Sequence, residues 1–392
     1  MQQDFDFDQL LNRDHSNSLK YDGRQAMFGS ADVIPLWVAD MDFASPPAIS
    51  EALLQRAKHP IYGYSSFPES IYQSLMDWLE RRHGWRIQRE WIVLCPGVVP
   101  SLNAAVMAFS NPGDAVIVQP PVYFPFFPAV TDSGRSLIQN QLRLENNQYH
   151  IDFEHLEACA ARAKMLLLCS PHNPVGRVWR KDELERLLAI AEKYQLIIFA
   201  DEIHSDLVYP PAKHQVLETL STQQVNIITA VAPSKTFNVP GLNLSALIIP
   251  DATQRLALTK VFERMHVSVT NPFSMVAFEA AYQHGDAWLD ALLGYLQQTR
   301  DFVLAYVSEH LPRVHAVVPE GTYLIWLDCR ELGLDDAALK QFFIQQAGVG
   351  LSPGRLFGEA GSGFMRMNIA APRLLITTAL QSMAGALQSF TK

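Results

Sequence analysis

The sequence of 392 residues lacks the features of several classes of protein. Its four cysteines are widely scattered and form no Cys-x-x-Cys pair, so we expect free buried thiols in a reducing cytoplasm rather than disulfides or a metal site. Its apolar runs are far too short to span a bilayer. Neither sign of charge forms blocks, and the formal net charge is −9, which argues against nucleic acid or an anionic membrane as the main partner.

Internal repeats and low-complexity linkers are also missing, and the start of the chain does not resemble a signal peptide. The segment Met1 to Leu10 is acidic and has no basic stretch that leads into an apolar one. The composition, 48% hydrophobic and 18% charged, is typical of a globular protein with a substantial core. Because this length exceeds what one core usually supports, we expect a large domain and a smaller one.

The middle of the chain alternates short apolar runs with helical patterns. Between two of these runs, residues 181–194 place leucines at helical spacing and charges on the opposite face. The runs that indicate buried strands are 115–119, 165–169, 196–200, 226–231 and 245–249. Strand, helix and strand in succession predict a mostly parallel α/β sheet with helices on both faces.

The last part of the chain has a different pattern, which predicts a compact α+β unit. A long helical stretch after Pro272 leads into it, and the unit itself is expected to contain strands at 321–328 and 363–369 and helices at 335–346 and 372–387. We therefore divide the chain into an N-terminal segment that joins the small domain, a large cofactor-binding domain and a small C-terminal α+β domain. The proposed bounds are 1–48, 49–285 and 286–392.

Three polar clusters follow predicted strands, at the positions where open α/β sheets bind ligands. They contain Asn173 in the turn 170–176, Asp201 with His204, and Lys235. A carboxylate after a buried strand needs a cation or a strong donor, and burial gives a lysine the neutral amine that forms a Schiff base. Taken singly, the clusters also fit an ordinary turn, an exposed loop and an exposed lysine. One histidine with two acids makes a metal site unfavourable.

Taken together, the three clusters match the needs of pyridoxal 5′-phosphate (PLP) chemistry. Lys235 would carry the cofactor, Asp201 would keep its pyridine nitrogen protonated, and Asn173 would donate to its ring hydroxyl. A glycine-led turn at 97–102 enters an apolar helix, which predicts an anion site for the phosphate. Tyr123 offers an aromatic face for the ring.

These motifs resemble those of fold-type I PLP enzymes of the aspartate-aminotransferase superfamily over nearly the full length. Within it, the chain is similar to the MalY/PatB group of cystathionine β-lyases, which are carbon–sulfur lyases. The resemblance implies an α/β fold with a large domain, whose mostly parallel sheet is flanked by helices, and a smaller α+β domain. The segments that carry it are 34–43 (IPLWVADMDF), 97–100 (GVVP), 121–123 (PVY), 170–176, 201–207 (DEIHSDL) and 234–238 (SKTFN).

The resemblance assigns cofactor-binding roles residue by residue. It implies that Lys235 is the catalytic Schiff-base lysine and proton shuttle, that Asp201 pairs with the pyridine nitrogen, and that Tyr123 stacks on the ring. Asn173 would bind the ring hydroxyl and His204 would lie beside the cofactor. The remaining cofactor contacts are expected from Val98, Val99 and Ser234 at the phosphate, and from Tyr64, or Tyr62, which a homodimer would lend to the neighbouring active site.

The resemblance also implies how an amino-acid substrate binds. Arg366 matches the arginine that binds the substrate α-carboxylate in this family. Arginine suits this task, because its planar fork binds a carboxylate through two bonds. Asn173 and Trp37 would complete the substrate site. His204 stands where many aminotransferases have a tyrosine, and Asn243 stands where they usually have a phosphate-binding arginine. Both departures count against a standard transaminase.

On this resemblance we expect α,β-elimination of L-cystathionine or an S-substituted L-cysteine to pyruvate, ammonia and a thiol. Residue spacing alone does not separate elimination from transamination, since both begin by removing the substrate's α-proton. A PLP-dependent aminotransferase of the same fold is therefore the first alternative. The second is a regulatory protein that contacts a transcription factor and has a secondary lyase activity.

Overall fold

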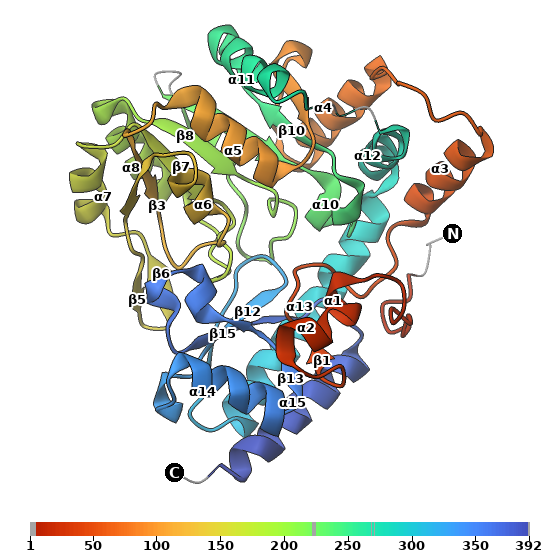
Figure 1. Ribbon diagram of the computed structural model, residues 1–392, viewed down its shortest axis with the longest axis vertical. Helices are drawn as coiled ribbons and strands as arrows, with labels where there is room; N and C mark the ends of the chain where they lie inside the picture. Colours follow the sequence, from red (N-terminus) through yellow and green to blue (C-terminus); the bar gives the residue numbers. More distant parts are fainter. Residues whose placement is uncertain (1–4, 222–224, 268, 270, 391–392) are drawn as a thin grey trace.

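The computed structural model describes residues 5–221, 225–267, 269 and 271–390. A seven-stranded sheet forms the centre of the larger lobe, and the predicted buried runs are five of its strands (Figure 1). Its order is β2 (Ile92–Cys95), β10 (Ser245–Ile248), β9 (Asn226–Val231), β8 (Ile197–Asp201), β7 (Met165–Cys169), β3 (Ala115–Val118) and β4 (Ser136–Gln139).

The sheet is parallel from β9 to β4, as the alternation of strands and helices predicted. Strand β10 differs, because it runs antiparallel to both of its neighbours, β9 and β2. The connection from β9 to β10 contains only the short helix α10 (Pro233–Thr236) and a 3-10 turn, and it includes no crossover helix. A short connection suits antiparallel pairing, whereas parallel strands need a longer crossover.

Helices cover both faces of this sheet and bury alternate side chains of its strands. One face packs against α7 (Phe153–Ala160), α8 (Lys181–Tyr194) and α9 (Leu217–Leu220). The other packs against α5 (Val98–Phe109), α6 (Phe126–Thr131) and α11 (Ala252–Arg264). Strands covered on both faces are apolar at nearly every position, which explains the continuous runs in the sequence.

The smaller lobe is built on a four-stranded antiparallel sheet. Its order is β11 (His315–Val317), β12 (Leu324–Asp328), β15 (Phe364–Asn368) and β14 (Ser352–Pro353), and it packs against α13 (Asp286–His310) and α15 (Arg373–Gln388) in one core. The predicted helix at 335–346 begins as α14 (Asp336–Gln341) and continues as a π-helical turn, in which Phe342, Phe343 and Ile344 are all buried.

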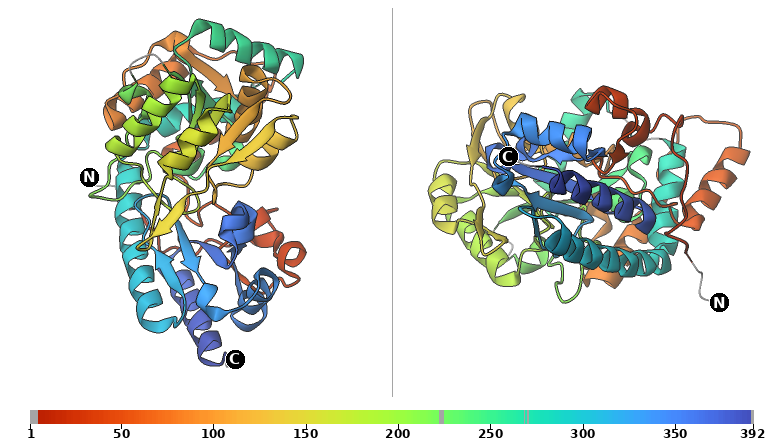
Figure 2. Two further views of the ribbon diagram at one scale, coloured as in Figure 1. Left: turned by 90° about the vertical axis from the view of Figure 1, so that its left-hand side faces the viewer. Right: turned by 90° about the horizontal axis from the view of Figure 1, so that it is seen from below.

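The N-terminal segment lies against the C-terminal part of the chain (Figure 2). Its strand β1 (Ile34–Pro35) pairs in parallel with β13 (Val349–Gly350) of the smaller lobe, and the domain bounds 1–48, 49–285 and 286–392 stay predictions. The other elements are α1 (Leu19–Asp22), α2 (Arg24–Phe28), α3 (Pro47–Lys58), α4 (Glu69–His83), α12 (Pro272–His284), and the hairpin of β5 (Arg143–Glu145) and β6 (Gln148–His150).

The described residues include neither a membrane-spanning helix nor a cluster of metal-ligating side chains. None of the helices in this part of the chain has both the length and the apolar character that crossing a membrane requires. Within the same residues, histidine, cysteine and acidic side chains form no group of three that could hold a metal ion.

Gly176 joins the two lobes, and its substitution tests this contact. Its φ angle is +71°, and a Cβ atom there would lie 2.4 Å from Cβ of Pro319. We expect Gly176→Ala to lower the free energy of unfolding by about 2–4 kcal/mol, because it adds backbone strain and a clash with the turn before β12.

Urea denaturation measures this loss, and Gly385→Ala is the matched control. Gly385 lies exposed in α15 with open space around it, so its substitution should be neutral or stabilising by up to about 1 kcal/mol. Equal stabilities of the two variants would contradict the predicted contact.

Candidate active site

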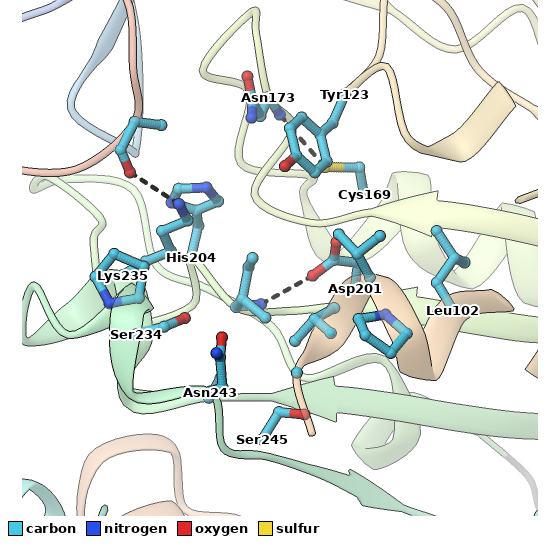
Figure 3. A pocket seen from close by; sticks show the side chains of 18 of the residues that line it. Leu102, Tyr123, Cys169, Asn173, Asp201, His204, Ser234, Lys235, Asn243 and Ser245 are labelled. Atoms are coloured by element: carbon cyan, nitrogen blue, oxygen red, sulfur yellow. Dashed lines mark hydrogen bonds between the residues drawn. The ribbon is translucent and has the colours of Figure 1, made fainter. Parts of the chain in front are cut away.

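A cavity of about 280 Å³ opens where the carboxyl ends of the central strands meet the start of α5 (Figure 3). The predicted clusters, which are far apart in the sequence, all contribute to its wall. The lining residues used below are Ala39, Gly97, Val98, Val99, Tyr123, Cys169, Asn173, Asp201, His204, Ser234, Lys235, Asn243 and Ser245. The parallel strands explain this convergence, since their carboxyl ends lie at one edge of the sheet.

Lys235 lies in the short helix α10, which begins just after β9. Its Nζ atom donates a hydrogen bond of 2.8 Å to the carbonyl oxygen of Ala39. Burial, with a further contribution from the positive charge of Arg366, lowers the pKa of Lys235 to about 8, although Asp40 and Asp201 act in the opposite direction. A neutral acceptor thus holds the amine, and a useful fraction of it is unprotonated near neutral pH.

Asp201 is the last residue of β8, and its carboxylate is buried. It accepts a hydrogen bond of 3.3 Å from the backbone N–H of Ile203, and no described cation lies within ion-pair distance of it. Burial therefore raises the pKa of Asp201 to about 7. A buried carboxylate without a cation can bind a protonated ring nitrogen.

Tyr123 and Asn173 form the opposite wall, beside Cys169 (Figure 3). The backbone N–H of Asn173 donates to the sulfur of Cys169 at 3.4 Å, which fixes the turn after β7. Oδ1 of Asn173 accepts a bond of 3.1 Å from Arg366, so its Nδ2 group is the part that can donate to a ligand. Tyr123 presents a half-buried ring to the same space.

Arg366 reaches the site from β15 of the smaller lobe, and it is buried. Besides Asn173, its guanidinium donates to the carbonyl oxygen of Trp37 at 2.8 Å and to Oγ of Ser352 at 3.3 Å. Burial lowers its pKa to about 10. Within the described part of the chain no carboxylate pairs with it, so its charge is available to a carboxylate ligand.

The start of helix α5 forms the end of the cavity that suits an anion. Gly97 adopts a φ angle of +143°, and Val98 and Val99 follow as the first helical residues. Their backbone N–H groups have no acceptor within the helix and lie at the positive end of its dipole. Ser234 and Ser245 line the same cavity, so hydroxyl groups are available beside these amides.

Comparison with known proteins agrees with this arrangement. The model of the family "Aminotransferase class I and II" matches residues 31–381. The chain belongs to this family. Cystathionine beta-lyase PatB of Bacillus subtilis is 40% identical over 97% of this chain and 99% of its own length. Protein MalY of Escherichia coli is 32% identical over 98% and 99%, respectively.

A solved structure is similar over the whole chain as well. Cystalysin from Treponema denticola, whose structure contains pyridoxal 5′-phosphate, matches with a TM-score of 0.96 and 36% identity. The match covers 99% of this chain and all of that one. The arrangement of both lobes is therefore that of the aminotransferase family.

Two residues that were predicted to act at the site, Trp37 and His204, do not offer a charged side chain of the kind that Lys235 or Arg366 offers. Trp37 contributes its carbonyl oxygen, whereas its indole donates to the carbonyl of Lys20 at 3.0 Å and packs on Phe28. His204 lines the cavity, and burial lowers its pKa to about 3, so the imidazole is neutral. Its Nδ1 atom is buried without a described partner, and its ring contacts Tyr323 edge to face.

Tyr62 and Tyr64 lie outside the cavity. The side chain of Tyr64 is fully exposed, at 103%. Tyr62 is also exposed, and its hydroxyl donates to the carbonyl of Ala57 at 3.2 Å. Neither tyrosine therefore contributes to the cavity of its own chain.

Sequence reasoning missed three residues that complete the site. Tyr323 donates to the carbonyl of Ala39 at 2.9 Å, and it was interpreted only as part of a strand. Ala39 belongs to the 34–43 motif, but its contact is made by the backbone carbonyl, which a pattern of side chains does not reveal. Ser352, which contacts Arg366, lies in a two-residue strand that is too short to predict.

The raised pKa of Asp201 predicts that the free energy of unfolding of the ligand-free protein depends on pH. Because the folded-state pKa is raised to about 7, the contribution of this carboxyl group to stability is complete below about pH 4 and is lost as the pH rises through 7. Asp201→Asn should therefore gain about 2–4 kcal/mol of unfolding free energy relative to the wild type between about pH 4 and about pH 8.

Urea unfolding of the ligand-free proteins at the two pH values measures this difference. Asp132→Asn, which changes an exposed residue, is the control. Its unfolding free energy relative to the wild type should be nearly the same at the two pH values. An Asp201→Asn variant with the same stability difference at both values would show that the carboxylate is compensated in the folded state.

Proposed function

We propose that the chain is a PLP-dependent carbon–sulfur β-lyase. Its substrate is L-cystathionine or a related S-substituted L-cysteine, and its products are pyruvate, ammonia and a thiol. The observation that carries the proposal is the match of 40% identity with cystathionine beta-lyase PatB, over 97% of this chain. The site supports it, because the cavity wall holds a lysine amine and a buried carboxylate, and the buried guanidinium of Arg366 contacts Asn173 of the same wall; none of the three forms a described ion pair with another.

The residues of the cavity fit PLP as a resident cofactor. Lys235 would bond to it, Asp201 would meet its pyridine nitrogen, and Asn173 would donate to its ring oxygen. Tyr123 would cover the ring, and the amides of Val98 and Val99 with the hydroxyl of Ser234 would hold the phosphate at the start of α5. When bound, PLP supplies an electron-accepting ring that makes the α-proton of the substrate acidic.

The protein side chains have separate tasks in this reaction. Arg366 binds the substrate α-carboxylate through two bonds and orients the α-carbon. Lys235, whose pKa is lowered to about 8, accepts the α-proton as a neutral amine. The bond between Cβ and sulfur then breaks, the sulfur leaves as a thiol after it gains a proton, and water releases the remaining fragment as pyruvate and ammonia.

Two features of the cavity favour elimination over transamination. His204 is neutral and stands where many aminotransferases place a tyrosine, so no phenol assists the ring oxygen from this position. Asn243 lies in the wall where they usually have a phosphate-binding arginine. Both substitutions agree with a carbon–sulfur lyase.

The exposed tyrosines support a homodimer with shared active sites. Tyr64 is fully exposed, and Ile61, Tyr62 and Val99 are exposed apolar residues. Val99 also lines the cavity, so the edge of the site reaches the surface. We propose that a second copy covers this surface and that its Tyr64 completes the phosphate site.

The proposal also covers the compartment in which the enzyme acts. We assign the enzyme to the cytoplasm, which is supported by four buried cysteines that are all free thiols. A regulatory contact with a transcription factor stays a prediction from resemblance alone.

The proposed reaction is tested with purified protein loaded with PLP and supplied with L-cystathionine. The wild type should absorb visible light and release pyruvate. Lys235→Ala, which lacks the amine that binds the cofactor and accepts the proton, should be colourless and lose at least about 10³-fold in rate. A coloured wild type that releases no pyruvate but transfers amino groups to a keto acid would contradict the lyase and indicate a transaminase.

Mixed variants test the shared active site. Tyr64→Ala and Lys235→Ala should each be nearly inactive, because one lacks the phosphate contact and the other lacks the reactive amine. Exchange of subunits between the two should create hybrids with one intact site, and activity should rise toward about a quarter of the wild-type rate. No recovery in a mixture that demonstrably exchanges subunits would exclude a role for Tyr64 in the partner's site.

A further inference from the structure

The backbone of residues 37–41 (the template segment) accepts hydrogen bonds from side chains of the N-terminal segment and of both lobes. The carbonyl of Trp37 binds Arg366 at 2.8 Å, and the carbonyl of Ala39 binds both Lys235 at 2.8 Å and Tyr323 at 2.9 Å. Further bonds reach Val38 and Asp40 from Asn368 at 2.6 and 2.7 Å, Asp40 from Lys20 at 3.2 Å, and Met41 from Asn238 at 3.1 Å and Arg13 at 3.2 Å.

The template segment connects the two groups that must act on one substrate. Lys235 comes from the short helix α10 after β9 in the larger lobe, and Arg366 comes from β15 in the smaller one. Each is bound by a carbonyl oxygen of the template segment, and the two carbonyls are two residues apart. The position of this backbone therefore sets the position of the proton acceptor relative to the carboxylate-binding group.

The chemical nature of the acceptors is suited to this role. A carbonyl oxygen orients a cation through its dipole without neutralising the charge. A carboxylate in its place would raise the pKa of Lys235 and would compete with the substrate for Arg366. The template segment thus holds both groups while leaving their chemistry available.

A partly buried cluster of charges, in which Lys20 and Asp42 are the buried members, holds the template segment itself. Lys20, with no exposed surface, donates to Oδ2 of Asp42 at 2.8 Å. Arg13 bridges Oδ2 of Asp40 and Oδ1 of Asp42, each at 2.6 Å. The two acids belong to the 34–43 segment, and the two cations come from the part of the chain that precedes it.

Stability alone does not account for such a cluster. A buried ion pair loses hydration that its attraction barely offsets, so apolar residues of similar volume often serve stability as well or better. What an apolar pair does not supply is a fixed direction, because charge-assisted hydrogen bonds define where the backbone lies.

We propose that Lys20 and Asp42 are positioning residues for the reaction, which hold the template segment so that its carbonyls align Lys235 with Arg366. The inference rests on the proposed function for the roles of these two groups. It predicts that loss of the Lys20–Asp42 pair weakens substrate binding and changes the surroundings of Lys235, although Lys235 and Arg366 themselves are still present.

The test compares PLP-loaded Lys20→Met and Asp42→Asn with the wild type. In Lys20→Met, Asp42 keeps its ion pair with Arg13, so no buried charge is left alone. We expect KM for L-cystathionine to rise at least tenfold, with a smaller fall in kcat. The pH midpoint of the visible absorption of the bound cofactor should shift by half a unit or more. Affinity for L-alanine, which has no leaving group at Cβ, should fall at least tenfold.

The matched control is Asp14→Asn, which breaks the exposed ion pair of Asp14 with Arg24 in the same part of the chain. It should leave KM and the affinity for L-alanine within twofold of the wild type and the pH midpoint unchanged. Variants of Lys20 and Asp42 that lower only the melting temperature, with the three values unchanged, would overturn the inference and leave the pair a structural role. A wild type that releases no pyruvate would refute the proposed lyase instead, and the absorption and L-alanine measurements would still decide the positioning role.

Discussion

Two charged groups that line one cavity and a third beside it do not neutralise each other. Lys235, Asp201 and Arg366 are held there mainly by uncharged partners, which are carbonyls, an amide, a hydroxyl and a backbone N–H. Burial shifts the pKa of each toward its uncharged form. Such an arrangement opposes folding, because no ion pair among the described residues compensates the lost hydration of these groups. The rest of the molecule must therefore supply both the stability and the rigidity that keep these groups apart.

The two sheets meet this requirement by different routes. The strands of the larger sheet are covered on both faces, and their carboxyl ends lie at one edge. Asn173, Asp201 and Lys235 therefore lie on backbone that has little freedom to move. Arg366 lies within the smaller sheet, whose core is continuous with α13 and α15. The groups of the two sheets are connected directly by the bond from Arg366 to Asn173. The segment 37–41 connects them a second time, because its carbonyls bind both Lys235 and Arg366.

The sequence predicted these features unevenly, and the reasons are physical. The strands before Asp201 and Lys235 were visible because burial on both faces demands unbroken apolar runs. The direction of β10 was not, since a run of the same composition serves either orientation. Side chains with distinctive chemistry, such as Arg366, were placed through motifs. The contact of Ala39 with Lys235 could not be predicted, because any residue offers the same carbonyl oxygen and only the folded chain shows where it lies.

On the proposed function, the unpaired groups of the site also give a physical basis for distinguishing ligands. A ligand that brings a protonated ring nitrogen to Asp201 and a carboxylate to Arg366 relieves the desolvation cost of both groups together. A ligand that lacks either charge leaves one of them buried and alone, which costs more than the missing contact itself. The same term that weakens the ligand-free fold therefore strengthens complementary binding, and binding in turn stabilises the fold. On the proposed function, selectivity for an amino acid bound with its cofactor would follow from charges that the protein leaves uncompensated.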